Sequence, residues 1–99
     1  MLVEFADNNL SRLEKDANYS AGFDQSLVRG FRKMVNTIRQ ALDERDFYAL
    51  KSLHFEKLSG KRKHQYSMRL NDQFRLIIEL INKDNAFKIV RIMEITDYH

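Results

Sequence analysis

The predicted fold depends most on the stretch YSMRLNDQFRL, residues 66–76. Its apolar side chains alternate with polar ones on both sides of Asn71-Asp72, and this period of two indicates extended strands with one apolar face. Asn and Asp tolerate the positive φ of tight hairpin turns, so Asn71-Asp72 predicts a two-residue turn. The stretch therefore predicts a β-hairpin.

The alternation continues toward the C-terminus, where residues 82–85 predict a second turn and residues 86–96 a long final strand. One face of this antiparallel meander can pack on helices, while the other, carrying Arg69 or Arg75, stays open. The expected faces of the final strand are Phe87, Ile89, Met93 and Ile95 on one side and Lys88, Val90, Ile92 and Glu94 on the other.

The N-terminal half has helical spacing instead. Residues 2–5 form a plausible first strand, residues 8–15 predict a brief helix, and residues 43–50 predict a short later one. Between them lies a long helix, capped by Asp24 or Ser26, in which Gly30 indicates a close approach of another element. Its apolar stripe comprises Leu27, Val28, Phe31, Met34, Val35, Ile38 and Leu42. The expectation is one α+β domain over residues 1–99, with N-terminal helices packed on one face of a small antiparallel sheet.

Positive charge gathers in the second half of the chain. Residues 51–99 hold 10 Lys/Arg against 6 Asp/Glu, whereas residues 1–50 hold 7 against 8. Such a local excess is typical of a protein that binds a polyanion, although a solvated basic loop has the same composition.

Several classes of protein are not expected. The chain has no cysteine, no apolar run long enough for a membrane span and no signal-peptide pattern, so we expect a cytoplasmic protein. The histidines lack metal-ligand spacing and no Gly-rich phosphate loop occurs, so we expect no metal and no cofactor.

The remaining polar residues suit metal-free cleavage of RNA, which needs a base, cations at the phosphate and an acid. Glu56 or His54 could be the base, and His99 or Tyr98 the acid. Asp97 could hold the end of the last strand through the backbone. The candidate cations and base-stacking rings for RNA are Arg75, Arg69, Arg62, Lys57, Lys61, Lys63, Phe55, Tyr66 and Tyr98.

Each of these residues also has a purely structural interpretation. Glu56 could simply balance Lys57 at the surface. Arg75 could form a cross-strand ion pair with Glu94 or Glu79. His99, as the last residue given, could be frayed.

Three blocks, EKLSGKRK (residues 56–63), QYSMRLNDQFRL (residues 65–76) and DYH (residues 97–99), resemble the HigB branch of the RelE/ParE toxin superfamily. In that branch a basic turn leads to a Tyr/Trp-Ser-Ile-Arg strand and an Asn-Asx-Gln-Trp-Arg hairpin, and the chain ends in Asp-Tyr-His. The resemblance covers roughly the second half of the chain.

This resemblance implies ribosome-dependent cleavage of mRNA, restrained by a HigA-type helix-turn-helix antitoxin. It implies that Arg75 stabilises the transition state and that Asp97, Tyr98 and His99 form the terminal group. Glu56 falls where some relatives have glutamate and many have histidine. If this segment is extended, His54 points the same way and could substitute, so the base stays open between the two.

Two other functions remain open. The ParE branch of the superfamily poisons gyrase without catalysis, so a non-catalytic toxin of the same fold is one alternative. An RNA-binding co-repressor that acts with its antitoxin is the other. The terminal Asp97-Tyr98-His99 favours the nuclease, because a gyrase poison needs no acid–base pair.

Overall fold

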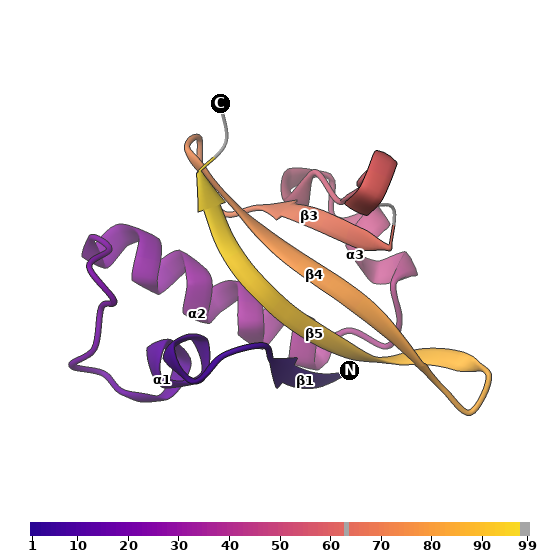
Figure 1. Cartoon of the computed structure of the whole chain (residues 1–99), viewed down its shortest axis with the longest axis horizontal. Coiled ribbons are helices and arrows are strands. Elements are labelled where there is room, and N and C mark those ends of the chain that lie inside the picture. The colour runs from indigo at the N-terminus through magenta and orange to yellow at the C-terminus, as the bar shows by residue number, and fades with distance from the viewer. Residues whose placement is uncertain (63, 98–99) are drawn as a thin grey trace.

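A five-stranded sheet with strand order β1-β5-β4-β3-β2 forms the centre of the computed structural model, which describes residues 1–62 and 64–97 (Figure 1). The strands β3, β4 and β5 form the predicted antiparallel meander, β2 adds a further antiparallel strand beside β3, and β1 pairs parallel with β5. The bounds of the strands are β1 Leu2–Phe5, β2 Glu56–Lys57, β3 Gln65–Arg69, β4 Phe74–Lys83 and β5 Ala86–Asp97.

The helices lie against one face of the sheet, so the predicted α+β class is confirmed (Figure 1). Asp7 and Asp24 cap the first two helices by accepting the backbone N–H of Leu10 and Leu27, at 2.9 and 2.8 Å. The helices are α1 Asn8–Lys15, α2 Gln25–Gln40 and α3 Arg45–Ala49, and two 3₁₀ turns follow as η1 Lys51–Leu53 and η2 Gly60–Arg62. None of the helices in the described ranges has both the length and the apolar character needed to cross a membrane.

The apolar stripe of α2 forms the helical side of the core, as its spacing predicts. Phe31, Val35 and Ile38 are fully buried. The prediction was wrong at Leu42, which is 80% exposed because α2 ends two residues earlier, at Gln40. The sheet contributes the buried side chains Met68, Leu76, Ile78, Val90 and Ile92 to the same core.

The β3–β4 connection differs from the predicted two-residue turn. It spans residues 70–73, and neither Asn71 nor Asp72 has a positive φ. Asn71 acts through its side chain instead: its Oδ1 accepts the N–H groups of Gln73 and Phe74 at 2.8 and 2.7 Å. The positive-φ pair occurs in the β4–β5 turn, at Asp84 (56°) and Asn85 (65°).

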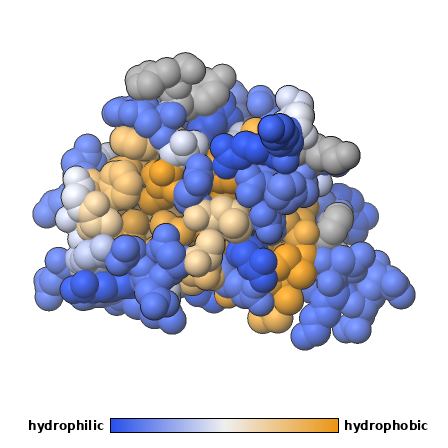
Figure 2. Space-filling view, in the orientation of Figure 1, coloured by the Kyte–Doolittle hydropathy of each residue, from blue (hydrophilic) through white to orange (hydrophobic). Residues whose placement is uncertain are grey.

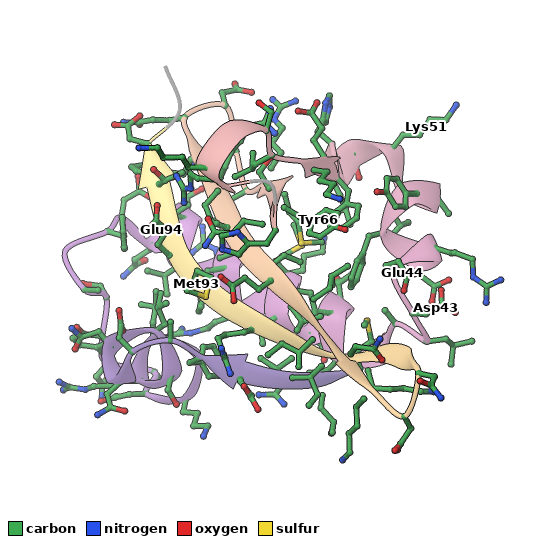
Figure 3. The ribbon with its side chains drawn as sticks, turned by 45° about the vertical axis from the view of Figure 1, so that its right-hand side comes forward. Asp43, Glu44, Lys51, Tyr66, Met93 and Glu94 are labelled. Carbon is green, nitrogen blue, oxygen red and sulfur yellow. The ribbon has the colours of Figure 1, made fainter. Side chains whose placement is uncertain are left out.

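A β-bulge at Met93 overturns the predicted faces of β5. Ile77 pairs with Glu94 and Ile78 with Ile92, so Met93 has no partner in β4. The alternation therefore shifts by one residue at this point, and the core receives Val90 and Ile92 before the bulge and Ile95 after it. Figure 3 labels Met93 and Glu94 next to each other on β5.

Candidate active site

The face of the sheet opposite α2 carries the polar residues of β3. Gln65, Ser67 and Arg69 alternate with the core-facing Tyr66 and Met68. Gln65 and Ser67 are nevertheless 9% and 2% exposed. Buried polar side chains are stable only with hydrogen-bond partners, so these two residues indicate a structured polar surface. Figure 2 shows hydrophilic residues around most of the rim of the molecule and hydrophobic ones in the middle of the view.

Arg75 of β4 lies on this open face and not in the helix-packed layer. Its Nη1 donates to the Oγ of Ser67 at 3.3 Å, diagonally across the β3–β4 pair. In the register of the sheet, Arg75 is opposite Arg69 on one side and Thr96 on the other. The buried hydroxyl of Ser67 thus orients the guanidinium of Arg75. Thr96, the partner of Arg75 in β5, is one residue before the end of that strand at Asp97.

A small pocket of about 150 Å³ opens beside this arginine. The pocket lies between the β3–β4 connection and the turn that follows η1. The residues that line it are His54, Arg69, Asn71, Asp72 and Arg75. The predicted candidates His54, Arg69 and Arg75 therefore meet at one place, although His54 is 21 positions before Arg75 in sequence.

His54 reaches this pocket by a route that the sequence did not indicate. Its φ and ψ are 47° and 49°, a left-handed conformation at the end of η1. The segment from His54 to Glu56 is therefore not extended, so the condition under which the two side chains would point the same way is not met. Glu56 instead pairs with Ser67 in the β2–β3 ladder and does not line the pocket.

Asp97 closes the described part of the chain at the same end of the sheet. It is opposite Phe74 in the ladder, and its Oδ2 accepts a hydrogen bond from Gln73 Nε2 at 3.1 Å. This side-chain contact fixes the end of β5 to the β3–β4 connection. The two other predicted terminal residues, Tyr98 and His99, lie outside the described residues.

Tyr66 and Lys57 do not share a face with Arg75. Tyr66 alternates with Ser67 and Gln65, and its ring stacks on Phe55 with centroids 5.0 Å apart and an interplanar angle of 4°. Lys57 is directly opposite Tyr66 in the ladder, so it projects to the same side. Figure 3 places Tyr66 on the side of the sheet toward α3. A base stacked on Tyr66 would therefore be separated from Arg75 by the sheet.

Further aromatic rings extend from Tyr66 toward α3. Phe55 also contacts Phe47 and Tyr48, with centroid separations of 5.3 and 4.7 Å. Tyr48 is itself exposed, and partial desolvation beside Phe55 raises the pKa of its phenol. The predicted stacking role of Phe55 does not fit its position, because Phe55 is buried in the core.

The basic turn is held against the open face by Arg62. Its Nε donates to Gln65 Oε1 at 2.8 Å, and its Nη2 is 3.4 Å from Glu94 Oε1. Lys61 beside it is exposed, and Lys63 lies outside the described residues. Arg62 thus lies on the same face as Arg75, but within a group of oppositely charged side chains that also contains Glu79, Arg91 and Glu94.

That group contains both carboxylates that the sequence offered as ion-pair partners of Arg75. Glu79 lies 3.3 Å from His64 Nε2 and 4.0 Å from Arg91 Nη1, and Glu94 contacts Arg62. Sequence reasoning did not single out Gln65 or Ser67. The available signal was their alternation with the core residues of β3, which placed both on the face of Arg69.

Comparisons with known proteins place these features in a family. The family model described as "HigB-like toxin: RelE-like toxin of type II toxin-antitoxin system HigB" matches residues 3–99. Comparison with curated protein sequences gave no match.

Solved structures share the fold at low sequence identity. The YoeB/ParE toxin from Agrobacterium tumefaciens has a TM-score of 0.61 and 11% identity, and the similarity covers 100% of both chains. A chain of the YoeB-YefM complex from Staphylococcus aureus has a TM-score of 0.60 and 19% identity, covering 100% of this chain and 98% of that one. Because the family model spans nearly the whole sequence and the fold agrees, this chain belongs to the HigB-like family of RelE-like toxins of type II toxin–antitoxin systems.

Proposed function

We propose that this toxin is a ribosome-dependent endoribonuclease that cleaves mRNA by metal-free acid–base catalysis and so inhibits translation. The observation that supports this most is the pocket in which Arg69, Arg75 and His54 meet. Two guanidinium groups and an imidazole beside a strand end match the needs of phosphodiester cleavage, where negative charge grows on the phosphate as the 2′-oxygen attacks.

In this proposal Arg75 stabilises the transition state. The guanidinium of an arginine can donate to two phosphate oxygens at once. The hydroxyl of Ser67, on the neighbouring strand β3, accepts a hydrogen bond from Arg75 and holds its guanidinium in place. A group that is oriented before the reaction needs no reorganisation when charge develops. Arg69 faces the same pocket and binds the RNA backbone.

His54 or Glu56 takes the proton of the 2′-hydroxyl. The pocket favours His54, since it lines the space next to Arg75, whereas Glu56 lies on β2, separated from Arg75 by β3 and outside the pocket lining. Tyr98 or His99 protonates the leaving 5′-oxygen, with Asp97 anchoring the strand that leads to them. These two terminal roles rest on the resemblance alone.

The proposed partners are mRNA, the ribosomal A site with its rRNA and a HigA-type helix-turn-helix antitoxin. The antitoxin is supported by the family, which is a toxin–antitoxin family, and by the YoeB-YefM complex among the similar structures. Lys61, Arg62 and Lys63 extend the contact with RNA along the basic turn. Translating ribosomes would place the reaction in the cytoplasm.

The test is toe-printing of mRNA on translating ribosomes with the parent protein, Arg75→Ala and Arg75→Lys. Removal of a preorganised donor to a developing oxyanion costs about 10²–10³ in rate, and lysine restores only part of this because it lacks the fork. The matched control is Arg91→Ala, an arginine on the same face that pairs with Glu4 at the far edge of the sheet.

We expect a cut in the ribosomal A site with the parent protein and with Arg91→Ala, and at least a hundredfold slower cleavage with Arg75→Ala. Growth arrest without any cleaved mRNA would reject the nuclease, and inhibition of gyrase supercoiling in the same extract would then identify a ParE-like poison. A companion pair of variants, His54→Gln and Glu56→Gln, identifies the general base. The variant that cleaves more slowly is the one from which the base has been removed.

A further inference from the structure

The pocket contains an electrostatic conflict between two arginines. Arg69 and Arg75 are directly opposite each other in the β3–β4 ladder, and Cβ atoms of such pairs are about 5 Å apart. Like charges directly opposite each other destabilise a sheet, and a nearby anion offsets this. Among the described residues that line the pocket, Asp72 carries a carboxylate.

Asp72 supplies that anion from the connection between the same two strands. Arg69 Nη2 donates to Asp72 Oδ1, and Arg69 Nε is 3.4 Å from the carbonyl oxygen of Asn71. The connection is fixed by the two hydrogen bonds to Asn71 Oδ1, so it presents Asp72 at a constant position. Both nitrogens of the guanidinium edge are therefore occupied by the protein's own oxygens.

This ion pair is easy to open. The side chain of Asp72 is 93% exposed and that of Arg69 is 39% exposed. Exposed pairs contribute little stability, because water solvates both ions well when they separate. A phosphate oxygen accepts the same guanidinium N–H groups as a carboxylate oxygen, so an RNA phosphate can take the place of Asp72 at Nη2 of Arg69 without any change in the strands.

We propose that Asp72 is a built-in competitor for the RNA phosphate at Arg69. Without RNA the carboxylate occupies the guanidinium and relieves its repulsion with Arg75; with RNA a backbone phosphodiester displaces it. The displaced carboxylate opposes binding, so a strand must be presented to both arginines at once to replace it, and loosely bound RNA is rejected. This inference rests on the proposed function, since it assigns the ligand of that pocket.

The experiment measures the affinity of a short fluorescein-labelled single-stranded RNA by fluorescence anisotropy, without ribosomes, at a series of salt concentrations. The proteins are the parent, Asp72→Asn, Arg69→Gln and the double variant. The charge-matched control is Asp84→Asn, in the β4–β5 turn at the other end of the sheet, where the positive φ of 56° is one that asparagine tolerates. Circular dichroism melts check that all variants fold.

We expect Asp72→Asn to bind the RNA at least about fivefold more tightly than the parent, from the Coulomb energy of one charge at contact distance. The affinity should also fall more steeply with salt, by about 0.7 in the logarithmic slope, because the charge of Asp72 no longer cancels that of Arg69 at the phosphate. In the Arg69→Gln background the same change should have no more effect than Asp84→Asn has in the parent.

Three results would overturn the inference: no gain from Asp72→Asn, including the case in which neither protein binds; an equal gain from Asp84→Asn; or a gain that persists without Arg69. The toe-printing assay decides the proposed function separately. If the gain in RNA affinity depends on Arg69 but no mRNA is cleaved on ribosomes, the pocket binds RNA and the proposed nuclease activity is rejected.

Discussion

Replacement of Gly30 by alanine should stabilise this protein, although the sequence alone suggested that Gly30 is needed for a close approach. Gly30 lies inside α2, below the connection that carries Asp72. A Cβ added to Gly30 would meet the carbonyl oxygen of Leu70 at 3.8 Å, which is an ordinary van der Waals contact. The neighbouring element is close, but it leaves room for a methyl group.

The magnitude follows from helix propensity. Alanine is favoured over glycine in a helix interior by about 1 kcal/mol, because glycine loses more backbone freedom on folding. With no steric cost to subtract, Gly30→Ala should raise the free energy of unfolding by about 0.5–1 kcal/mol. For a domain of this size that corresponds to a rise in Tm of about 2–8 °C.

The matched control is Gly22→Ala, because Gly22 also has space for a Cβ but adopts a φ of 84°. An L-residue in the left-handed region costs about 1–2 kcal/mol, so this change should destabilise the protein. Urea unfolding followed by circular dichroism measures both variants. A lower stability for Gly30→Ala, with an unchanged m-value, would refute the reasoning, since it would require the carbonyl of Leu70 to be closer than the structure has it.

Three further predictions concern the aromatic cluster, the β3–β4 connection and α3. Phe47→Ala should cost about 3–5 kcal/mol in the free energy of unfolding, because the ring is fully buried; a loss below 1 kcal/mol in urea unfolding would contradict its place in the core. Asn71→Ala should cost about 1 kcal/mol and broaden the amide NMR signals of the connection, as two backbone N–H groups lose their acceptor; unchanged spectra would count against the fixed connection. Hydrogen bonds from Arg45 lower the pKa of Asp43 to about 2, so this carboxylate adds stability above about pH 4 that is lost as the pH falls through 2. NMR titration should find this midpoint in the parent and a return toward 3.8 in Arg45→Ala; the same midpoint in both would disprove the cause.

Local signals in the sequence were sufficient for most of the elements. The cap at Asp24 and the stripe through Phe31 and Val35 depend only on neighbours within one or two helical turns, so the position of α2 follows from them. The turn type predicted at Asn71 was wrong because local signals are not sufficient there. Asparagine can enter a turn either by adopting a positive φ or by accepting backbone N–H groups, and its neighbours in sequence do not decide between the two.

The candidate site could be predicted only in part. The resemblance in residues 65–76 pointed to Arg75 on β4. It did not point to Ser67, to the pocket contact of His54 or to the separation of Tyr66 from Arg75. These features depend on strand register, on the left-handed turn at His54 and on the aromatic packing around Phe55, all of which join segments distant in sequence.

By itself the sequence determined the α+β class, the helix boundaries to within about two residues and the concentration of positive charge in the second half. Those properties arise from periodicity, capping and composition, which are local. Tertiary structure alone decided that the bulge at Met93 turns Ile95 toward the core and that Arg69 and Arg75 lie opposite each other, with Asp72 of the β3–β4 connection bonded to Arg69. The pairing of strands fixes these relations, and a shift of one residue in register would have reversed every one of them.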